Sequence, residues 1–206
     1  MAFSSCGEFV EFEEEKEDAT KLTLARHNLD LMVGDKFVLP VKLTPDTLPN
    51  MSVYWATADK TIVEMRTDTM VAVAVGKAKV MVTAVSGLAS DTCQVTVYPL
   101  WQLSSRYAPY ETMLYAQVTV DNAPMSSDMT VAAFCGEELR GVGKLTTGAG
   151  KTYLAIRIYS ETAEHDVIGF RCYDPKRALV SVAKEELTFD GETHGTLSQL
   201  FTLTFD

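Results

Sequence analysis

The sequence predicts an all-β protein made of two tandem β-sandwiches that follow a flexible acidic N-terminal tether. Three observations lead to this expectation. Apolar residues recur with a period of two through most of the chain, which is the spacing of side chains on one face of a β-strand. Turn-forming glycine, proline, asparagine and aspartate separate these segments at short intervals. The 206 residues leave room for two domains of ordinary size, and 47% of them are hydrophobic, enough to build two cores.

The first 18 residues carry most of the net charge of the chain. They contain seven acids and one lysine, which is a charge of −6 out of a total of −10. A segment this acidic cannot bury enough apolar surface to fold by itself, so residues 1–21 are expected to form a flexible tether. The rest of the chain has no cluster of lysine and arginine, which argues against a nucleic-acid partner.

The tether contains a short motif around Cys6. The residues Phe-Ser-Ser-Cys at positions 3–6 resemble the lipobox of bacterial lipoproteins, in which small residues precede the lipidated cysteine. The resemblance implies lipid attachment at Cys6, with Met1 inside or just after the apolar region of a longer precursor. The acidic stretch that follows is similar to the surface-export signal of Bacteroidetes lipoproteins. The alternative is a free cysteine in a disordered leader. No run of 18 apolar residues exists, so the expected membrane contact is this anchor alone.

Residues 22–98 are expected to form the first sandwich from short alternating strands. Trp55 lies in the middle of one of them and is expected to pack in the core. Cys93 alternates with two valines, which predicts a buried and unreactive thiol. The three valines of residues 71–75 are expected to share one face. The alternating segments are 37–43, 51–55, 71–75, 80–82 and 93–97.

Several motifs of this region occur in a familiar order. The segment 31–35 (LMVGD) opens it, the segment 53–59 (VYWATAD) follows a stretch ending in Pro45, and the segment 93–97 (CQVTV) closes it. In this order they resemble the bacterial immunoglobulin-like group 2 domain over nearly its whole length. Residues 66–69 depart from the family, which usually has glycine there. The resemblance implies a spacer or adhesive module of bacterial surfaces, not an enzyme.

Residues 99–105 are expected to connect the two domains, and residues 106–206 to form the second sandwich. Pro99 should end the preceding strand, and Trp101 is expected to pack at the junction. Alternation then resumes through about eight segments. They are 113–120, 129–136, 139–145, 152–159, 167–173, 178–182, 186–189 and 200–205.

Three segments of the second domain are distinctive: 129–142, 170–174 and 194–197. Together they resemble a poorly characterised β-domain at the C-termini of secreted and surface proteins of Bacteroidetes. In that pattern a cysteine often stands just before Arg-Gly, whereas this chain has Leu139 there and Cys135 earlier. The resemblance implies surface display next to other modules, as in Bacteroides cell-surface lipoproteins and adhesins, and no reaction.

Two interpretations remain open for Cys135 and Cys172. Both lie on expected strands of one domain outside the cytoplasm, so they form either a disulfide or two separate buried thiols. The four cysteines have no C-x-x-C spacing, and no histidine has a ligand partner at metal-binding spacing. The sequence therefore predicts no catalytic residue, no cofactor and no metal site. A calcium site built from distant loops stays open at this stage.

Two functions compete on these grounds. The first is a non-enzymatic adhesion or interaction module of the cell surface, anchored to the outer membrane, whose ligand is an extracellular protein or glycan. The alternative is a carbohydrate-binding protein of a polysaccharide uptake system. Most tyrosines that could contact sugar occupy alternating strand positions, where a core or sheet-face role is commoner. These tyrosines are Tyr107, Tyr110, Tyr115, Tyr153 and Tyr159.

Overall fold

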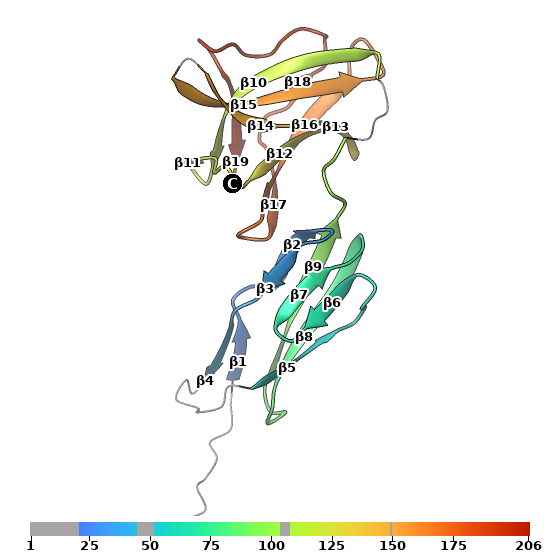
Figure 1. The fold of residues 1–206 in the computed structure, drawn as a ribbon, viewed down its shortest axis with the longest axis vertical. Helices are drawn as coiled ribbons and strands as arrows, with labels where there is room; N and C mark the ends of the chain where they lie inside the picture. The colour runs from blue at the N-terminus through green and yellow to red at the C-terminus, as the bar shows by residue number, and fades with distance from the viewer. Residues whose placement is uncertain (1–20, 45–51, 104–107, 149) are drawn as a thin grey trace, which may run out of the picture.

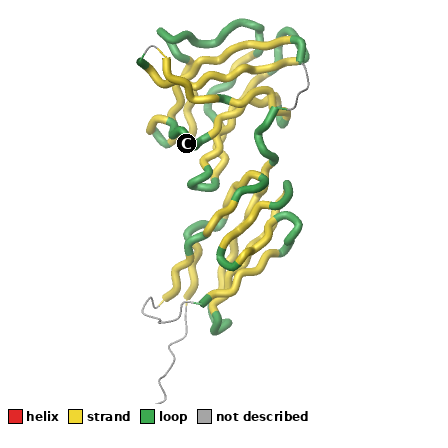
Figure 2. The backbone as a smooth tube through the Cα atoms, viewed as in Figure 1, coloured by secondary structure: helices red, strands yellow, loops and turns green. Residues whose placement is uncertain are grey.

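A computed structural model gives the fold of the chain and describes residues 21–44, 52–103, 108–148 and 150–206. These residues form strands and loops, with no helix among them (Figure 2). The predicted all-β architecture of two tandem sandwiches is confirmed, with the N-terminal one at the bottom of Figure 1. Within the described residues there is no helix that is long and apolar enough to cross a membrane. Cys6 and Tyr107 lie outside the described residues.

The N-terminal sandwich is immunoglobulin-like, with two facing sheets and a separate strand pair. One sheet has the order β2-β9-β8-β5, and the other has the order β3-β7-β6. β1 pairs with β4, and β2 runs parallel to β9 whereas the other pairs are antiparallel. The strands are β1 (Lys21–Leu24), β2 (Asn28–Met32), β3 (Lys36–Val38), β4 (Val41–Thr44), β5 (Val53–Thr57), β6 (Val63–Arg66), β7 (Thr69–Ala72), β8 (Gly76–Ala84) and β9 (Ser90–Tyr98).

The core of this sandwich follows the predicted alternation in its two longest strands. Every second residue is buried from Ala78 to the end of β8 and from Cys93 to Val97 in β9. Burial raises the pKa of the Cys93 thiol to about 11, so the thiolate is not formed near neutral pH. Trp55 packs against the same core from β5. The predicted roles of Cys93 and Trp55 as core residues are therefore confirmed.

Two predictions for this half were wrong in detail. Residues 37–43 do not form one strand, because the chain breaks at Leu39 and Pro40 between β3 and β4. Proline has no amide hydrogen to donate to a sheet. The valines of residues 71–75 do not share a buried face either. Met70 and Ala72 point into the core, and β7 ends at Ala72, which leaves Val73 and Val75 exposed.

The C-terminal sandwich has two five-stranded sheets, and its strands lie close to the predicted segments. One sheet has the order β11-β10-β15-β14, with β19 parallel to β10, and the other has the order β13-β12-β16-β17, with β18 paired to β16. The strands are β10 (Tyr110–Val120), β11 (Ala123–Pro124), β12 (Thr130–Cys135), β13 (Glu138–Val142), β14 (Lys144–Gly148), β15 (Lys151–Ser160), β16 (Val167–Asp174), β17 (Leu179–Val182), β18 (Leu187–Thr188) and β19 (Phe201–Phe205).

One predicted strand of this half, 139–145, crosses from one sheet to the other. Its first part is β13 in the sheet of β12, and its second part is β14 in the sheet of β15, with Gly143 between them. A Cβ atom at Gly143 would lie 2.7 Å from the Cδ1 atom of Leu154. Glycine therefore lets the backbone pass over the core side chains of β15 as it changes sheets.

Candidate interaction surfaces

The β16–β17 hairpin projects from the C-terminal sandwich and contacts the N-terminal one (Figure 1). In its turn, the Asp174 carboxylate accepts hydrogen bonds from the amides of Lys176 at 2.9 Å and Arg177 at 3.1 Å. The Arg177 carbonyl accepts a hydrogen bond from the Arg26 guanidinium of the other half. Ala178 has a left-handed φ of 46° and is fully buried in the core cluster of the N-terminal sandwich. The hairpin is therefore part of both sandwiches.

The hairpin also completes the outer edge of β2, the edge that faces away from β9. The Asp30 amide donates to the Ala178 carbonyl at 2.8 Å, and the Val180 amide donates to the Asp30 carboxylate at 3.1 Å. Burial raises the pKa of Asp30 above its ordinary value, although the Val180 hydrogen bond opposes this. An edge strand with unpaired amides is a site for unwanted pairing, and here the second sandwich covers it.

Just beyond the end of β2, a second pair of residues joins the two halves. The Asp35 carboxylate accepts a hydrogen bond from the Met32 amide at 2.8 Å, and the Tyr173 hydroxyl donates to the same oxygen. Burial and this hydrogen bond raise the pKa of Tyr173. Trp101 of the connector packs edge-on against Phe134, with ring centroids 5.6 Å apart, and against Tyr173 at 6.4 Å. The prediction that Trp101 packs at the junction is confirmed.

No pattern in the sequence indicates that Asp30, Asp35 and Ala178 belong to this junction. Asp30 and Val180 are separated by 150 residues, and neither belongs to a recognisable motif. Only the path of the hairpin in space brings them together. This junction uses the sheet of β12 and β16, so the sheet of β10 and β15 lies on the opposite side of the C-terminal sandwich.

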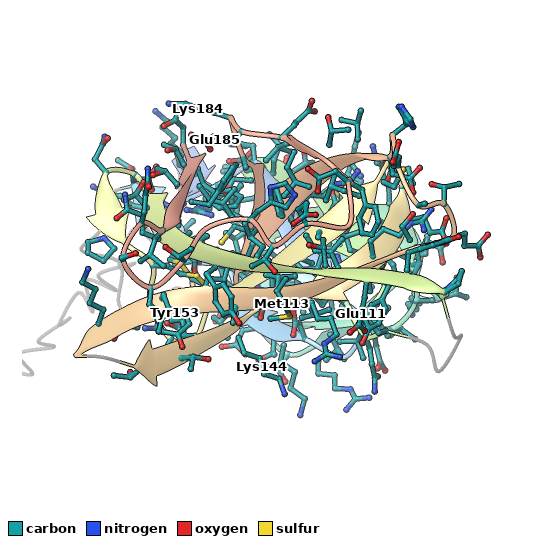
Figure 3. The ribbon with its side chains drawn as sticks, turned by 90° about the horizontal axis from the view of Figure 1, so that it is seen from above. Glu111, Met113, Lys144, Tyr153, Lys184 and Glu185 are labelled. Atoms are coloured by element: carbon teal, nitrogen blue, oxygen red, sulfur yellow. The ribbon has the colours of Figure 1, made fainter. Side chains whose placement is uncertain are left out.

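The outer face of the β10–β15 sheet carries large half-buried side chains. We call Met113, Tyr115, Tyr153 and Tyr159 the tyrosine face. Their strand neighbours point into the core, so all four side chains point outward. The rings of Tyr115 and Tyr153 contact each other edge-on, with centroids 5.8 Å apart and planes at 70°. Met113 and Tyr153 lie along this sheet in the view from above (Figure 3).

Charged residues surround the tyrosine face. Arg157, opposite Met113, forms an ion pair with Glu111 at 3.1 Å. Lys144 of β14 lies on the same face, opposite Ala155, and the alternation of β15 places Lys151 there as well. Glu111 and Lys144 are labelled beside the sheet in Figure 3. Three cations and one carboxylate thus lie on this face of a chain whose total charge is −10.

The possible disulfide between Cys135 and Cys172 is not formed. Both are free thiols, and Cys172 lies opposite Val131 in the pairing of β12 with β16. Cys135 is four residues further along β12, about 13 Å at the rise of a β-strand. A disulfide needs Cα atoms within about 7 Å. Burial raises the pKa of Cys172 to about 12, as for an unreactive core thiol.

The described residues do not bring together a metal-binding cluster. Within the described ranges, no three His, Cys, Asp or Glu side chains converge closely enough to hold a metal ion. Each histidine lies beside one carboxylate: His27 beside Asp91, His165 beside Glu164 and His194 beside Asp190. The rings of His27 and His194 form hydrogen bonds with their carboxylates at 3.0 and 3.1 Å.

Neither a protein-family model nor a curated protein matches this chain. Among solved structures, it is similar to domains 1–6 of the surface layer protein SbsC, with TM-score 0.32, 12% identity and coverage of 81% of this chain and 25% of that one. It is also similar to extracellular cadherin domains 1–4 of protocadherin gamma B7, with TM-score 0.33, 13% identity and coverage of 84% and 50%.

A third similar structure contains fibronectin(III)-like modules of Clostridium thermocellum CbhA, with TM-score 0.30, 13% identity and coverage of 89% and 93%. The chain spans a quarter of the SbsC structure and half of the protocadherin structure. TM-scores of this size carry no argument about function or partner. The two finer resemblances, to the group 2 domain and to the Bacteroidetes C-terminal domain, therefore stay predictions.

Proposed function

We propose that this chain is a non-enzymatic cell-surface protein that binds an extracellular protein partner through the tyrosine face. The observation that carries the proposal is the composition of this face, with three tyrosines and Met113 beside Arg157 on an outward sheet surface. Tyrosine, methionine and arginine are the residues enriched at the centres of protein interfaces, and tyrosine and arginine are frequent hot spots. Half-buried rings also lose little side-chain freedom on binding.

The charge around the face indicates the chemistry of the partner. Lys144 and Lys151 make this surface basic although the whole chain is acidic. A partner with an acidic patch would be attracted to this surface in preference to the rest of the molecule, and the attraction should weaken with salt. The junction supports the same function, because it holds the two sandwiches together and keeps the tyrosine face on the side away from the N-terminal half.

Binding can be tested with the full chain and a defined panel of extracellular proteins. Mucin, fibronectin and laminin would be immobilised in native and deglycosylated form, and binding measured at low and high salt. We expect at least one protein to bind in both forms, with Tyr153→Ser and Tyr115→Ser weakening binding at least tenfold. Val38→Ser, at an exposed residue of β3 in the other sandwich, is the control and should bind normally.

Two results of that panel would redirect the proposal. Binding that is lost on deglycosylation would favour the carbohydrate alternative. The edge-on contact of Tyr115 with Tyr153 does not offer the coplanar rings on which a sugar would stack. Binding to none of the proteins would favour a passive spacer. Turnover of chromogenic glycoside, ester or peptide substrates by the purified chain would contradict the non-enzymatic part.

The proposed attachment to the outer membrane depends on Cys6 and needs its own test. Intact-mass spectrometry of the protein isolated from its native cells would detect acyl chains on Cys6. The expected result is a mature chain that begins at a lipidated Cys6 and is exposed to protease on whole cells. An unmodified Cys6, or a mature N-terminus elsewhere, would contradict this attachment.

A further inference from the structure

The outer edge of β5 differs from the protected edge of β2 at the other end of the same sheet. β5 is the terminal strand in the order β2-β9-β8-β5, and no other described strand pairs with it. Its residues, Val53 to Thr57, include no charged residue and no proline. Natural edge strands usually carry charge, proline or a covering segment, because these features prevent pairing with another chain. Among the described residues, β5 has none of these protections.

The hydrogen-bond pattern shows which amides of β5 point outward. The Ser52 carbonyl accepts from the Val85 amide at 3.2 Å, and the Ala58 amide donates to the Lys79 carbonyl at 2.9 Å. In an antiparallel pair, bonded and non-bonded positions alternate. Tyr54 and Ala56 therefore bond to β8, as Ser52 and Ala58 do. The amide and carbonyl groups of the alternate residues of β5 point to the outer edge.

Exposed apolar side chains lie next to this edge. Tyr54 is 67% exposed, and it lies opposite Thr83 in β8, between Met81 and Val85 on the outer face of the sheet. Met81 is 43% exposed and Val85 is 53% exposed. Leu88, in the turn between β8 and β9, is 71% exposed. Exposed apolar groups that are gathered together, as Tyr54, Met81 and Val85 are, mark interaction sites.

We infer that two copies of this chain associate through antiparallel pairing of their β5 strands. A two-fold axis at Trp55 would pair the outward amide and carbonyl of each Trp55 with those of the other copy. In this register, Tyr54 of one copy lies beside Ala56 of the second copy, and each Ala56 lies opposite Met81 of its own chain. The small side chain of Ala56 leaves room for the tyrosine ring to contact Met81. The contact is self-complementary, as a two-fold interface requires.

The charge and packing of β5 favour a second copy of the chain as the partner at its outer edge. The five residues that would face each other carry no charge, so pairing brings no like charges together. Val53 and Trp55 are half-buried on the inner face and Tyr54 is exposed on the outer face, so pairing would cover apolar surface on both sides of the strand. The area is small, so we expect a reversible dimer.

Sedimentation velocity of the full chain from low to high micromolar concentration tests the association. We expect a concentration-dependent monomer–dimer equilibrium that Tyr54→Lys weakens at least tenfold. Val182→Lys is the matched control, because Val182 is also 67% exposed and lies on β17, the terminal strand of another sheet. Tyr153→Ser should dimerise normally, which separates this association from the proposed partner binding. A chain that stays monomeric throughout would overturn the inference.

Hydrogen exchange by NMR tests the pairing itself. At high concentration, the amides of Val53, Trp55 and Thr57 should exchange more slowly, whereas those of Tyr54 and Ala56, already bonded to β8, should be unchanged. An alternating effect is specific to strand pairing, since contact through the apolar patch alone would not produce it. A dimer in which Trp55 exchange is independent of concentration, or a dimer that Tyr54→Lys leaves intact, would contradict the inference.

Discussion

At the scale of single residues, the two glycines after Arg140 determine how the C-terminal chain changes sheets. A Cβ atom at Gly141 would lie 2.5 Å from the backbone oxygen of Arg157, and one at Gly143 would lie 2.7 Å from Leu154. Neither glycine has a positive φ, so the requirement is for space and not for backbone conformation. Gly141 belongs to the distinctive segment 129–142 and Gly143 follows it, but the reason for both glycines depends on β15, which comes later in the chain.

Replacing Gly143 with alanine tests this requirement for space. Gly143→Ala should destabilise the protein by about 1–3 kcal/mol, because the added methyl group overpacks the core. Gly169→Ala is the matched control, since nothing lies within 4 Å of a Cβ atom there and its φ is not positive. Urea unfolding would give both free energies. Equal stabilities for the two variants would contradict the proposed role of Gly143.

Single residues also mark the limit of sequence-based prediction at the junction. Trp101 was predictable, because a tryptophan two residues after Pro99 in a short connector has few places to pack. Ala178 was not predictable, since alanine carries no signal for a left-handed φ of 46° or for burial in the core of the other sandwich. Its methyl group packs in the core of the N-terminal sandwich, and its carbonyl accepts a hydrogen bond from the Asp30 amide. Both interactions are with residues far away in the sequence.

At the scale of strands, the period-two pattern predicted the C-terminal half better than the N-terminal half. In long strands such as β10 and β15, the prediction rests on the alternation of many residues, so one unusual position does not change it. In a short strand, a single unusual position is enough to make the prediction wrong. In residues 71–75 the valines alternate, but Met70 and Ala72 are the residues that point into the core, and the strand ends at Ala72. The sequence pattern could not reveal where β7 stops.

β1 is a short strand that depends on one carboxylate outside its own sheet. The Asp91 carboxylate of β9 accepts a hydrogen bond from the Leu24 amide at 2.9 Å and contacts the His27 ring at 3.0 Å. The Leu24 hydrogen bond is the main reason that the pKa of Asp91 is lowered. A lowered carboxyl pKa means that the ionised form stabilises the folded state.

Asp91→Asn should therefore destabilise the protein in a pH-dependent way. At pH 7 we expect a loss of about 1 kcal/mol, as for one charge-assisted hydrogen bond that is partly exposed. The stabilisation by wild-type Asp91 is present above the unfolded pKa of about 3.9 and is lost as pH falls through the lower folded value. Urea midpoints at neutral and acidic pH would show the gap between the two proteins closing at acidic pH. A gap that stays constant would contradict this role.

At the scale of the whole molecule, the junction makes the stability of each sandwich depend on the other. Ala178 is buried in the core of the N-terminal sandwich, and the outer edge of β2 bonds to the hairpin. Tyr173 adds a hydrogen bond to Asp35. Sequence patterns predicted two sandwiches and a connector but not this dependence, because its contacts join residues up to 151 positions apart.

Calorimetry of the full chain tests whether the stability of each sandwich depends on the other. We expect wild type to unfold in one cooperative transition and Tyr173→Phe to lose about 1–2 kcal/mol, as for one buried hydrogen bond. Combining Tyr173→Phe with Asp30→Ala should separate the trace into two transitions, one for each sandwich. Tyr54→Phe removes an exposed hydroxyl and serves as the control. Two separate transitions in wild type would show that the sandwiches unfold independently.

The parallel pairing of β10 with β19 has a consequence for how the protein is made. β19 lies beside β10 in the sheet, and the paired side chains of Gln117 and Thr202 are 85 residues apart. A ribosome that has translated β10 must add most of the remaining chain before β19 exists. More residues still separate Asp30 from Ala178, the partner of its amide. Pairings this distant slow folding. The nascent chain would thus carry two incomplete sheets from the translation of β10 until Ala178 is added, and a chaperone would be most useful to it in that period.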